Sequence, residues 1–373
     1  MNFKELRDLS QKHELRIDDH EDFKRTPPYY YDSLRHAFGF YFNTFLTSNS
    51  RYEYYADGTA DRDVLDEDNT VLTIVAFQRF FELFIKDLLR RVNPMLFLKS
   101  TRGIKETDHI EGEGEFLKNK DTLTFGATLS KFYELMDKSK RDDFGSDSML
   151  VKFRGIIRDY AFMDSVIHES SLRYLGWWRD KIVHKGNSLP GLKLLDYLIT
   201  QRLLPIVNEI AKVDHAKLND SLFYLETVTK ISIVNELMKV KFGMDDGNKR
   251  ETFNSLLKIG HLKELGRASL NMNQFMRSNH ASYEYNYRDV MGRGVRFAEA
   301  ERAHSHFKKV ISCPCCGVKS LVYYREVIAD MFKPESTKNI DWVKCYTCDY
   351  HLRYNVGDLS IWNEDFRKIF SEE

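Results

Sequence analysis

The sequence lacks a long hydrophobic run and an excess of charge of either sign. No stretch approaches about 18 uninterrupted apolar residues, which excludes a transmembrane helix. The charged segment from Met1 to Arg25 also lacks the apolar run of a signal peptide. Lys and Arg together number 56, as do Asp and Glu, so no overall field draws the protein to nucleic acid or acidic membranes. Any nucleic-acid site must therefore be local.

Cysteine is scarce, since the chain has five and all lie between Cys313 and Cys348. A secreted disulfide scaffold would spread an even number of cysteines through a small chain. Cysteines gathered in one place are typical of a metal site in a reducing compartment. We therefore expect a cytoplasmic protein that has no contact with a membrane.

Four of these cysteines form two Cys-x-x-Cys pairs, Cys313/Cys316 and Cys345/Cys348, with 28 residues between the pairs. Each pair turns the chain so that two thiolates face one ion, and four thiolates complete a tetrahedral Zn²⁺ site with Zn–S bonds of about 2.3 Å. Residues 308–357 thus resemble a zinc ribbon with a long spacer. The resemblance implies a structural zinc ion that has no open position for catalysis.

The remaining cysteine leaves alternatives open. Cys315 is expected to be a free thiol beside the metal, with redox chemistry or alternate ligation as the other possibilities. His351 is a weaker candidate to replace one thiolate. Asp349 stands where zinc ribbons usually have glycine after the second pair, and Asp tolerates a left-handed backbone better than most residues.

Hydrophobic spacing predicts a mainly α fold with a small β ribbon at the C-terminus. Asp68 or Thr70 is expected to cap the first long helix, and Asn93-Pro94 to end it. Pro205 should kink or divide a later helix. The predicted helices cover residues 71–92, 123–138, 147–163, 166–184, 190–213 and much of 218–300, with a helix over 295–310 leading into the cysteines.

The segment LGWWRDKIVHKGNS, residues 175–188, contains the candidate catalytic residues Arg179, Asp180 and His184. On a continuous α-helix a five-residue step separates the Arg179 and His184 side chains by about 140°. They converge better if the helix ends near His184, for which Gly186 is a suitable residue. The alternative is an ion pair at a helix end with a capping histidine.

An arginine near a histidine can cleave RNA without a metal. Histidine, with an ordinary pKa near about 6.5, can take a proton from the ribose 2′-OH or give one to the leaving oxygen. Arginine can hold phosphate oxygens and stabilise the charge that develops on them. This chemistry requires the 2′-OH, so it would cleave RNA and spare DNA.

Arg-Asp-x-x-x-His matches the Arg-x(4–6)-His signature of HEPN-domain ribonucleases, which this chain resembles over about residues 65–213. AFQRFFELFIKDLLRR, residues 76–91, is similar to the long HEPN helix with its Glu-x-x-x-Lys core. The resemblance implies a HEPN-like helical bundle in which Arg179 binds the scissile phosphate and His184 is the acid or base. Asp180 would orient both side chains. Because only one credible motif is present, it also implies a homodimer with a composite site.

The predicted organisation has four parts: an N-terminal helical and aromatic segment (1–64), a HEPN-like domain (65–213), a helical connector (214–307) and a zinc ribbon with its tail (308–373). The leading hypothesis is a metal-independent endoribonuclease, a toxin or anti-phage effector with an antitoxin or activator as partner. The alternatives are a non-catalytic module that binds nucleic acid through the ribbon and dimerises through its helices, and an adaptor that binds protein through the ribbon. Glu82 either faces the site or pairs with Lys86.

Overall fold

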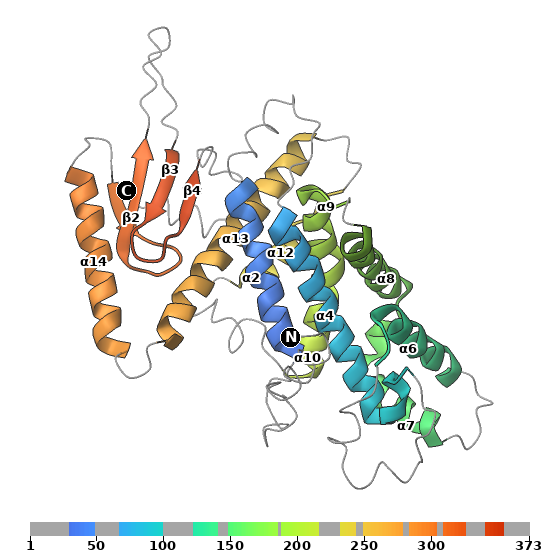
Figure 1. Ribbon diagram of the computed structural model, residues 1–373. Coiled ribbons are helices and arrows are strands. Elements are labelled where there is room, and N and C mark those ends of the chain that lie inside the picture. The colour runs from blue at the N-terminus through green and yellow to red at the C-terminus, as the bar shows by residue number, and fades with distance from the viewer. Residues whose placement is uncertain are drawn as a thin grey trace, which may run out of the picture. The chain divides into compact units, whose positions relative to one another are not determined.

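The computed structural model describes residues 30–48, 67–99, 122–140, 148–185, 188–215, 232–243, 249–278, 283–303, 309–325 and 340–353. These residues are mostly helical, with one four-stranded antiparallel sheet near the C-terminus, which confirms the predicted mainly α fold with a small β ribbon (Figure 1). Two predicted features lie outside the described residues: the N-terminal segment before residue 30 and most of the long spacer of the ribbon.

The chain divides into two compact units, one within Met1–Tyr31 and Glu82–Asp159, and the other within Asp32–Phe81 and Tyr160–Glu373. The predicted boundaries after residues 64, 213 and 307 stay predictions. Both candidate sites fall in the second unit, because Arg179, His184 and all five cysteines lie beyond Tyr160.

The first unit is built on aromatic packing between helices. The Phe132 ring of α6 (Phe125–Ser139) packs edge-on against Phe153 of α7 (Ser148–Ile157), with ring centroids 5.9 Å apart. The Asn93 side chain accepts a hydrogen bond from the Met95 N–H and begins the short 3₁₀ helix η3 (Pro94–Phe97). Helix α4 (Glu67–Val92) therefore ends at Asn93-Pro94, as predicted.

Two predictions on α4 can be checked directly. The Lys86 Nζ donates to Glu82 Oε1 at 2.6 Å. Of the two alternatives for Glu82, a place facing the site or an ion pair with Lys86, the structure has the ion pair. The predicted cap was wrong, because α4 begins at Glu67 and both Asp68 and Thr70 lie inside it. The Thr70 side chain is fully buried inside α4, whereas a capping side chain lies at the end of its helix.

The second unit contains most of the helices and the whole sheet. Helix α8 (Val166–Asp180) continues into a π turn, η6 (Lys181–Lys185). The helix predicted over 190–213 runs without a break from Leu192 to Val213, so Pro205 does not divide it, and a second π turn lies just before the proline. In chain order, the helical parts of the second unit are α2 (Tyr30–Ser48) from Asp32 on, the start of α4, η5 (Arg158–Asp164) from Tyr160 on, α8, η6, α9 (Leu192–Tyr197), η7 (Leu198–Leu203), α10 (Leu204–Val213), α12 (Ile233–Lys239), α13 (Lys249–Ser278) and α14 (Tyr283–Ala303).

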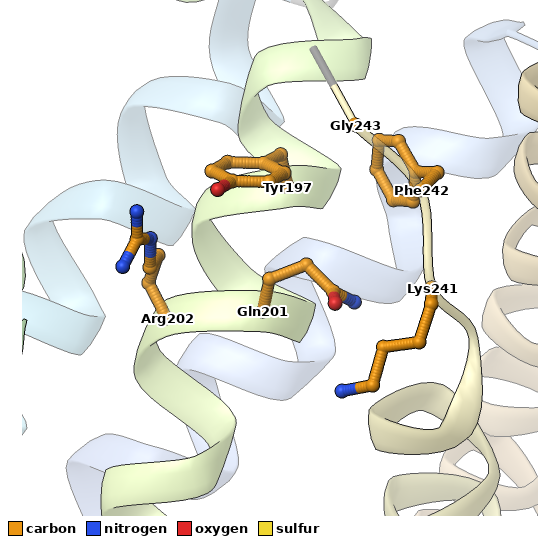
Figure 2. Close-up of a pocket in the computed structure, with 6 residues that line it drawn as sticks. All are labelled: Tyr197, Gln201, Arg202, Lys241, Phe242 and Gly243. Atoms are coloured by element: carbon orange, nitrogen blue, oxygen red, sulfur yellow. The ribbon is translucent and has the colours of Figure 1, made fainter. Parts of the chain in front are cut away.

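The π turn η7 is tied to a distant segment of the chain. Gln201 projects from η7 toward residues 241–243, which follow α12 (Figure 2). Its Nε2 donates to the Val240 carbonyl at 2.5 Å and to Thr200 Oγ1 at 2.9 Å. The chain after α12 is thereby held beside η7.

Helix α13 crosses the core of the second unit and carries buried charges. Lys263 is fully buried, and its Nζ lies 2.5 Å from Asp196 Oδ1 of α9 and donates to Thr44 Oγ1 at 2.9 Å. The Tyr41 hydroxyl donates to the same Asp196 oxygen at 3.0 Å. A buried charge needs such partners, because its removal from water is costly. This network joins α2, α9 and α13.

The closest packing in this core is at Gly266 of α13. A Cβ atom placed there would lie 2.4 Å from Cε2 of Phe42 in α2. Phe42 is fully buried and packs on Phe38, so its ring has no free space to enter. Glycine is required at this position because the two helices approach so closely.

We expect Gly266→Ala to lower the free energy of unfolding by about 1–3 kcal/mol, the usual cost of overpacking a core. Gly39→Ala, in α2, is the matched control, because a Cβ atom there meets nothing within 4 Å. That control should be neutral or stabilise by up to about 1 kcal/mol. Chemical denaturation of both variants measures the difference, and equal stabilities would contradict the packing described.

The sheet is an antiparallel meander in the order β1-β2-β3-β4. Helix α14 runs beside it (Figure 1). Its Ala298 packs on Val310 and Val322 of the sheet. The prediction of a helix over 295–310 was wrong at its end, since Lys309 and Val310 pair with β2. The strands are β1 (Lys309–Ser312), β2 (Lys319–Arg325), β3 (Ile340–Cys345) and β4 (His351–Arg353). Within the described ranges, no helix is long and apolar enough to cross a membrane.

Candidate functional site

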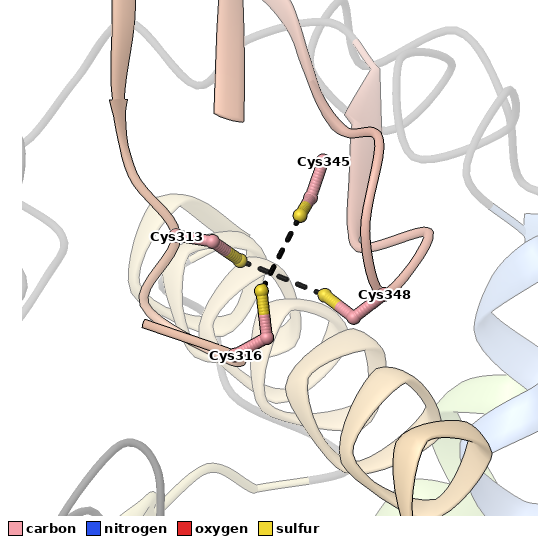
Figure 3. Close-up of side chains that lie close together, drawn as sticks. All are labelled: Cys313, Cys316, Cys345 and Cys348. Carbon is pink, nitrogen blue, oxygen red and sulfur yellow. Dashed lines mark hydrogen bonds between the residues drawn. The ribbon is translucent and has the colours of Figure 1, made fainter. Parts of the chain in front are cut away.

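The four predicted metal ligands come together between the strands. Cys313 and Cys316 follow β1, whereas Cys345 ends β3 and Cys348 lies in the turn before β4. The four sulfur atoms are buried and all lie within 4.8 Å of one another. In Figure 3 the four side chains point at a common centre. Four buried cysteines in this arrangement could hold one metal ion.

The distances between the sulfurs fit a tetrahedral ion. The Cys313 and Cys348 sulfurs are 3.6 Å apart, as are those of Cys316 and Cys345. Four thiolates at Zn–S distances of about 2.3 Å would be separated by about 3.8 Å along each tetrahedron edge. Only a small adjustment would therefore be needed to bind a metal of this size.

The backbone of each turn supports the sulfurs. The Cys315 N–H donates to the Cys313 sulfur at 3.3 Å, and the Thr347 N–H donates to the Cys345 sulfur at 3.4 Å. Gly317 and Asp349 each close a turn with a positive φ, 71° and 59°. Asp349 therefore takes the left-handed conformation that its position after the second pair requires.

The electrostatics of the cluster also suit a cation. Hydrogen bonds from Cys313, Cys316 and Cys348 lower the pKa of Cys345. Burial, by contrast, raises the pKa of Cys313. Four sulfurs so close together favour a shared cation, because thiolates are the metal-binding form of cysteine. Metal binding to such a group releases the remaining thiol protons.

The two alternative ligands stand apart from this cluster. The sulfur of Cys315 lies 3.2 Å from the Ser269 hydroxyl of α13, so it faces that helix. His351 uses its backbone N–H to donate to Glu264 Oε1 at 2.6 Å. Neither residue belongs to the four-ligand group found among the described residues. His304 and His306 lie outside those residues.

The second cysteine turn rests on α13 through buried polar contacts that the sequence did not indicate. Arg267 donates from Nε and Nη2 to the two carboxylate oxygens of Glu264, both at 2.7 Å, and from Nη2 to the Asp349 carbonyl. Burial raises the pKa of Glu264 to about 7, and the Arg267 hydrogen bonds oppose that rise. The three-residue spacing of Glu264 and Arg267 did not indicate a buried pair in the sequence, because exposed helices carry the same spacing.

A third contact joins the same two segments. A hydrogen bond links His261 Nε2 to the Tyr350 hydroxyl, and both side chains are buried. Burial lowers the pKa of His261 well below its ordinary value, so the ring is neutral. The conformation of the second cysteine turn therefore depends on its contacts with α13, and the position of α13 depends on the same contacts.

We expect the purified protein to contain a metal ion, and Cys345→Ser to lose it and to lower the unfolding temperature of the helical core, because the turn that Cys345 organises rests on α13. Cys315→Ser is the matched control and should keep the metal, since its sulfur faces Ser269. Elemental analysis and thermal unfolding of both purified variants check this. Metal retained by Cys345→Ser, or lost by Cys315→Ser, would contradict the ligand assignment.

The candidate catalytic residues lie at the end of α8. Arg179 is half-buried, and its Nη1 donates to Asp180 Oδ1 at 3.0 Å. Its Nε is buried and has no hydrogen-bond partner among the described residues. His184 is exposed in the π turn η6 and forms no hydrogen bond or ion pair within the described part of the chain. The structure thus pairs Arg179 with Asp180, whereas the convergence of Arg179 and His184 on a substrate stays a prediction.

The π turn changes the expected geometry between Arg179 and His184. In a π turn the hydrogen bonds span five residues, so each turn takes more residues than in an α-helix. Over a five-residue step that includes this turn, the angle between the Arg179 and His184 side chains is therefore smaller than the roughly 140° of a regular α-helix. The sequence contained no signal for this turn.

An exposed aromatic pair lies next to these residues. Tyr174 and Trp177 are stacked, with centroids 5.5 Å apart and planes at 14°, and the Lys181 ammonium lies 4.1 Å from the Trp177 ring centroid. Trp177 is 46% exposed and Trp178 only 7%. Trp178 is therefore a packing residue, whereas a large part of Trp177 is open to solvent.

Comparison of the chain with protein-family models, with curated proteins and with solved structures gave no match. The resemblance to HEPN ribonucleases therefore rests on the Arg-x(4–6)-His motif and its helical surroundings alone.

Proposed function

We propose that this protein is a metal-independent endoribonuclease with a HEPN-like helical domain, whose catalytic residues are Arg179, Asp180 and His184. The observation that carries the proposal is the exposure of His184 in a π turn directly after the Arg179–Asp180 pair. A histidine in contact with solvent can exchange protons with a substrate. Local π turns inside helices occur frequently at functional sites.

The reaction would be attack of the ribose 2′-OH on the adjacent phosphorus. One histidine takes the 2′-OH proton while the new P–O bond forms, and a second histidine gives a proton to the 5′ oxygen as its P–O bond breaks. The products are a 2′,3′-cyclic phosphate and a 5′-OH end. Because each chain has one such motif, the two histidines would be His184 of two copies in a homodimer.

Arg179 would bind the non-bridging oxygens of the scissile phosphate. Its Nη1 donates to Asp180, and this contact would hold the guanidinium plane while Nη2 binds a phosphate oxygen. An arginine in this position stabilises the charge that grows on phosphate oxygens as the nucleophile attacks. Asp180 would thereby act as a positioning residue.

The stacked pair Tyr174 and Trp177 would contact bases of the RNA strand. Aromatic side chains beside cations bind single-stranded nucleic acid without sequence preference, because every base has a flat face. Lys181 supplies the nearby positive charge. The proposed substrate is therefore unpaired RNA.

The ion in the four-cysteine cluster is proposed to be Zn²⁺ with a structural role. Four thiolates fill a tetrahedral zinc site, so the ribbon would order the chain and grip RNA or a partner protein. A ribonuclease in the cytoplasm must be controlled, and we include an antitoxin or activator among its partners. A role as a toxin or anti-phage defence effector follows from that requirement.

Arg179→Ala and His184→Ala should each reduce cleavage of RNA by about 100-fold or more, the usual contribution of acid–base catalysis. Both variants should stay folded, because the His184 side chain is exposed and Arg179 has one ion pair among the residues that the structure describes. The assay uses labelled total RNA and matched DNA, with analysis of the product ends. Arg173→Ala, whose arginine pairs with Glu169 on the same helix, is the matched control.

Cleavage that persists in both variants would show that the site lies elsewhere. A folded, metal-loaded dimer that binds RNA but does not cut it would instead favour a non-catalytic binding module. DNA cleavage at equal rates would exclude the 2′-OH mechanism.

Trp177→Ala should weaken binding of single-stranded RNA by about 1–3 kcal/mol, the usual value of a base stacked on an aromatic ring. The maximal cleavage rate should change little, because Trp177 is not assigned to proton transfer. Fluorescence anisotropy with an uncleavable RNA measures the affinity. Unchanged affinity would remove the aromatic pair from the RNA-binding surface.

A further inference from the structure

An open pocket lies in the second unit between η7 and the segment after α12. Its cavity volume is about 520 Å³, within the range of about 300–1,000 Å³ that small-molecule sites usually have. Tyr197, Gln201 and Arg202 line it from the helical side, and Lys241, Phe242 and Gly243 from the other (Figure 2). None of these residues is part of the candidate catalytic site or the cysteine cluster.

Two cations line this pocket without an acidic partner. Neither the Arg202 nor the Lys241 side chain forms an ion pair with any residue that the structure describes. Other basic side chains nearby do so: Lys212 pairs with Glu209 at 2.5 Å, and Lys239 with Glu236 at 2.6 Å. Two positive charges on one concave surface attract an anion, and phosphate groups bind well to arginine and lysine together.

The pocket also has aromatic walls. The Arg202 guanidinium carbon lies 5.5 Å from the centroid of the half-buried Tyr197 ring. Phe242 meets Tyr197 edge-on, with centroids 6.0 Å apart and planes at 80°, which fixes the orientation of the tyrosine. A planar ring in a ligand can pack beside Tyr197 and Arg202, since both present flat surfaces to it.

Hydrogen bonds hold together the two backbone segments that line the pocket. The Gln201 hydrogen bonds to Val240 and Thr200 hold the two segments together. The π turn that contains Gln201 and Arg202 widens the helix at this point, and such turns occur frequently at functional sites. Binding therefore does not require the two backbone segments to be brought together first.

We propose that this pocket binds a nucleotide, with its phosphate at Arg202 and Lys241 and its base beside Tyr197. The same chemistry occurs in a free mononucleotide and in the 5′-phosphorylated end of an RNA strand. The proposal does not depend on the endoribonuclease function, because it concerns binding by residues outside the catalytic set. A nucleotide bound here would lie on η7, which packs against α8.

The test uses the full-length, metal-loaded protein in calorimetric titrations with AMP, CMP, inorganic phosphate and an uncleavable 2′-O-methyl RNA, with and without a 5′-phosphate. We expect saturable binding of a mononucleotide or of the phosphorylated RNA. The double variant Arg202→Gln/Lys241→Gln should weaken it by about tenfold or more, as loss of charged hydrogen bonds to phosphate usually does. Lys212→Gln, a cation on the adjacent helix with its own acidic partner, should bind as the wild type does.

The variant Tyr197→Leu distinguishes the contribution of the base to the binding affinity from that of the phosphate. It should weaken binding of the nucleotide several-fold and leave binding of inorganic phosphate unchanged. Tighter binding of the mononucleotides identifies a free ligand, and tighter binding of the phosphorylated RNA identifies the strand end. No saturable binding of any probe, equal binding in the double variant, or phosphate binding as tight as nucleotide binding would overturn the proposal, whatever the cleavage assay shows.

Discussion

The buried charges of α13 are the constraint on which the second unit depends. Lys263 and Glu264 are adjacent and fully buried, and neither could remain ionised there without a partner. Lys263 finds Asp196 on α9, and Glu264 finds Arg267 and the backbone of the second cysteine turn. Helix α13 therefore contacts the core helices through Lys263 and the cysteine ribbon through Glu264.

Both candidate sites and the pocket are connected to this helix. Asp196, which holds Lys263, immediately precedes Tyr197 in the wall of the pocket. The Arg267 contact with Asp349 fixes the turn that positions Cys348. Helix α8, which carries Arg179, packs on the π turn that follows α9. The chemistry at the surface is thus supported by polar contacts in the interior, where geometry is least variable.

Much of this could be predicted where the signal is local. The cysteine spacing fixed which four thiols meet, and apolar periodicity located most helices, because both depend on neighbours along the chain. The buried partners of Lys263 could not be predicted, since Thr44 and Asp196 are distant in sequence. The π turns at Lys181–Lys185 and Leu198–Leu203 were also missed, because their residues have no distinctive composition.

The Lys263–Asp196 pair has a consequence for how this sequence can change. Replacing either residue alone would leave the other charge buried without its partner, which usually lowers the free energy of unfolding by about 3–5 kcal/mol. Replacing both by apolar residues of similar volume need not cost stability at all. Evolutionary drift at these two positions should therefore be correlated, with the pair kept or exchanged as one unit among chains that share this core.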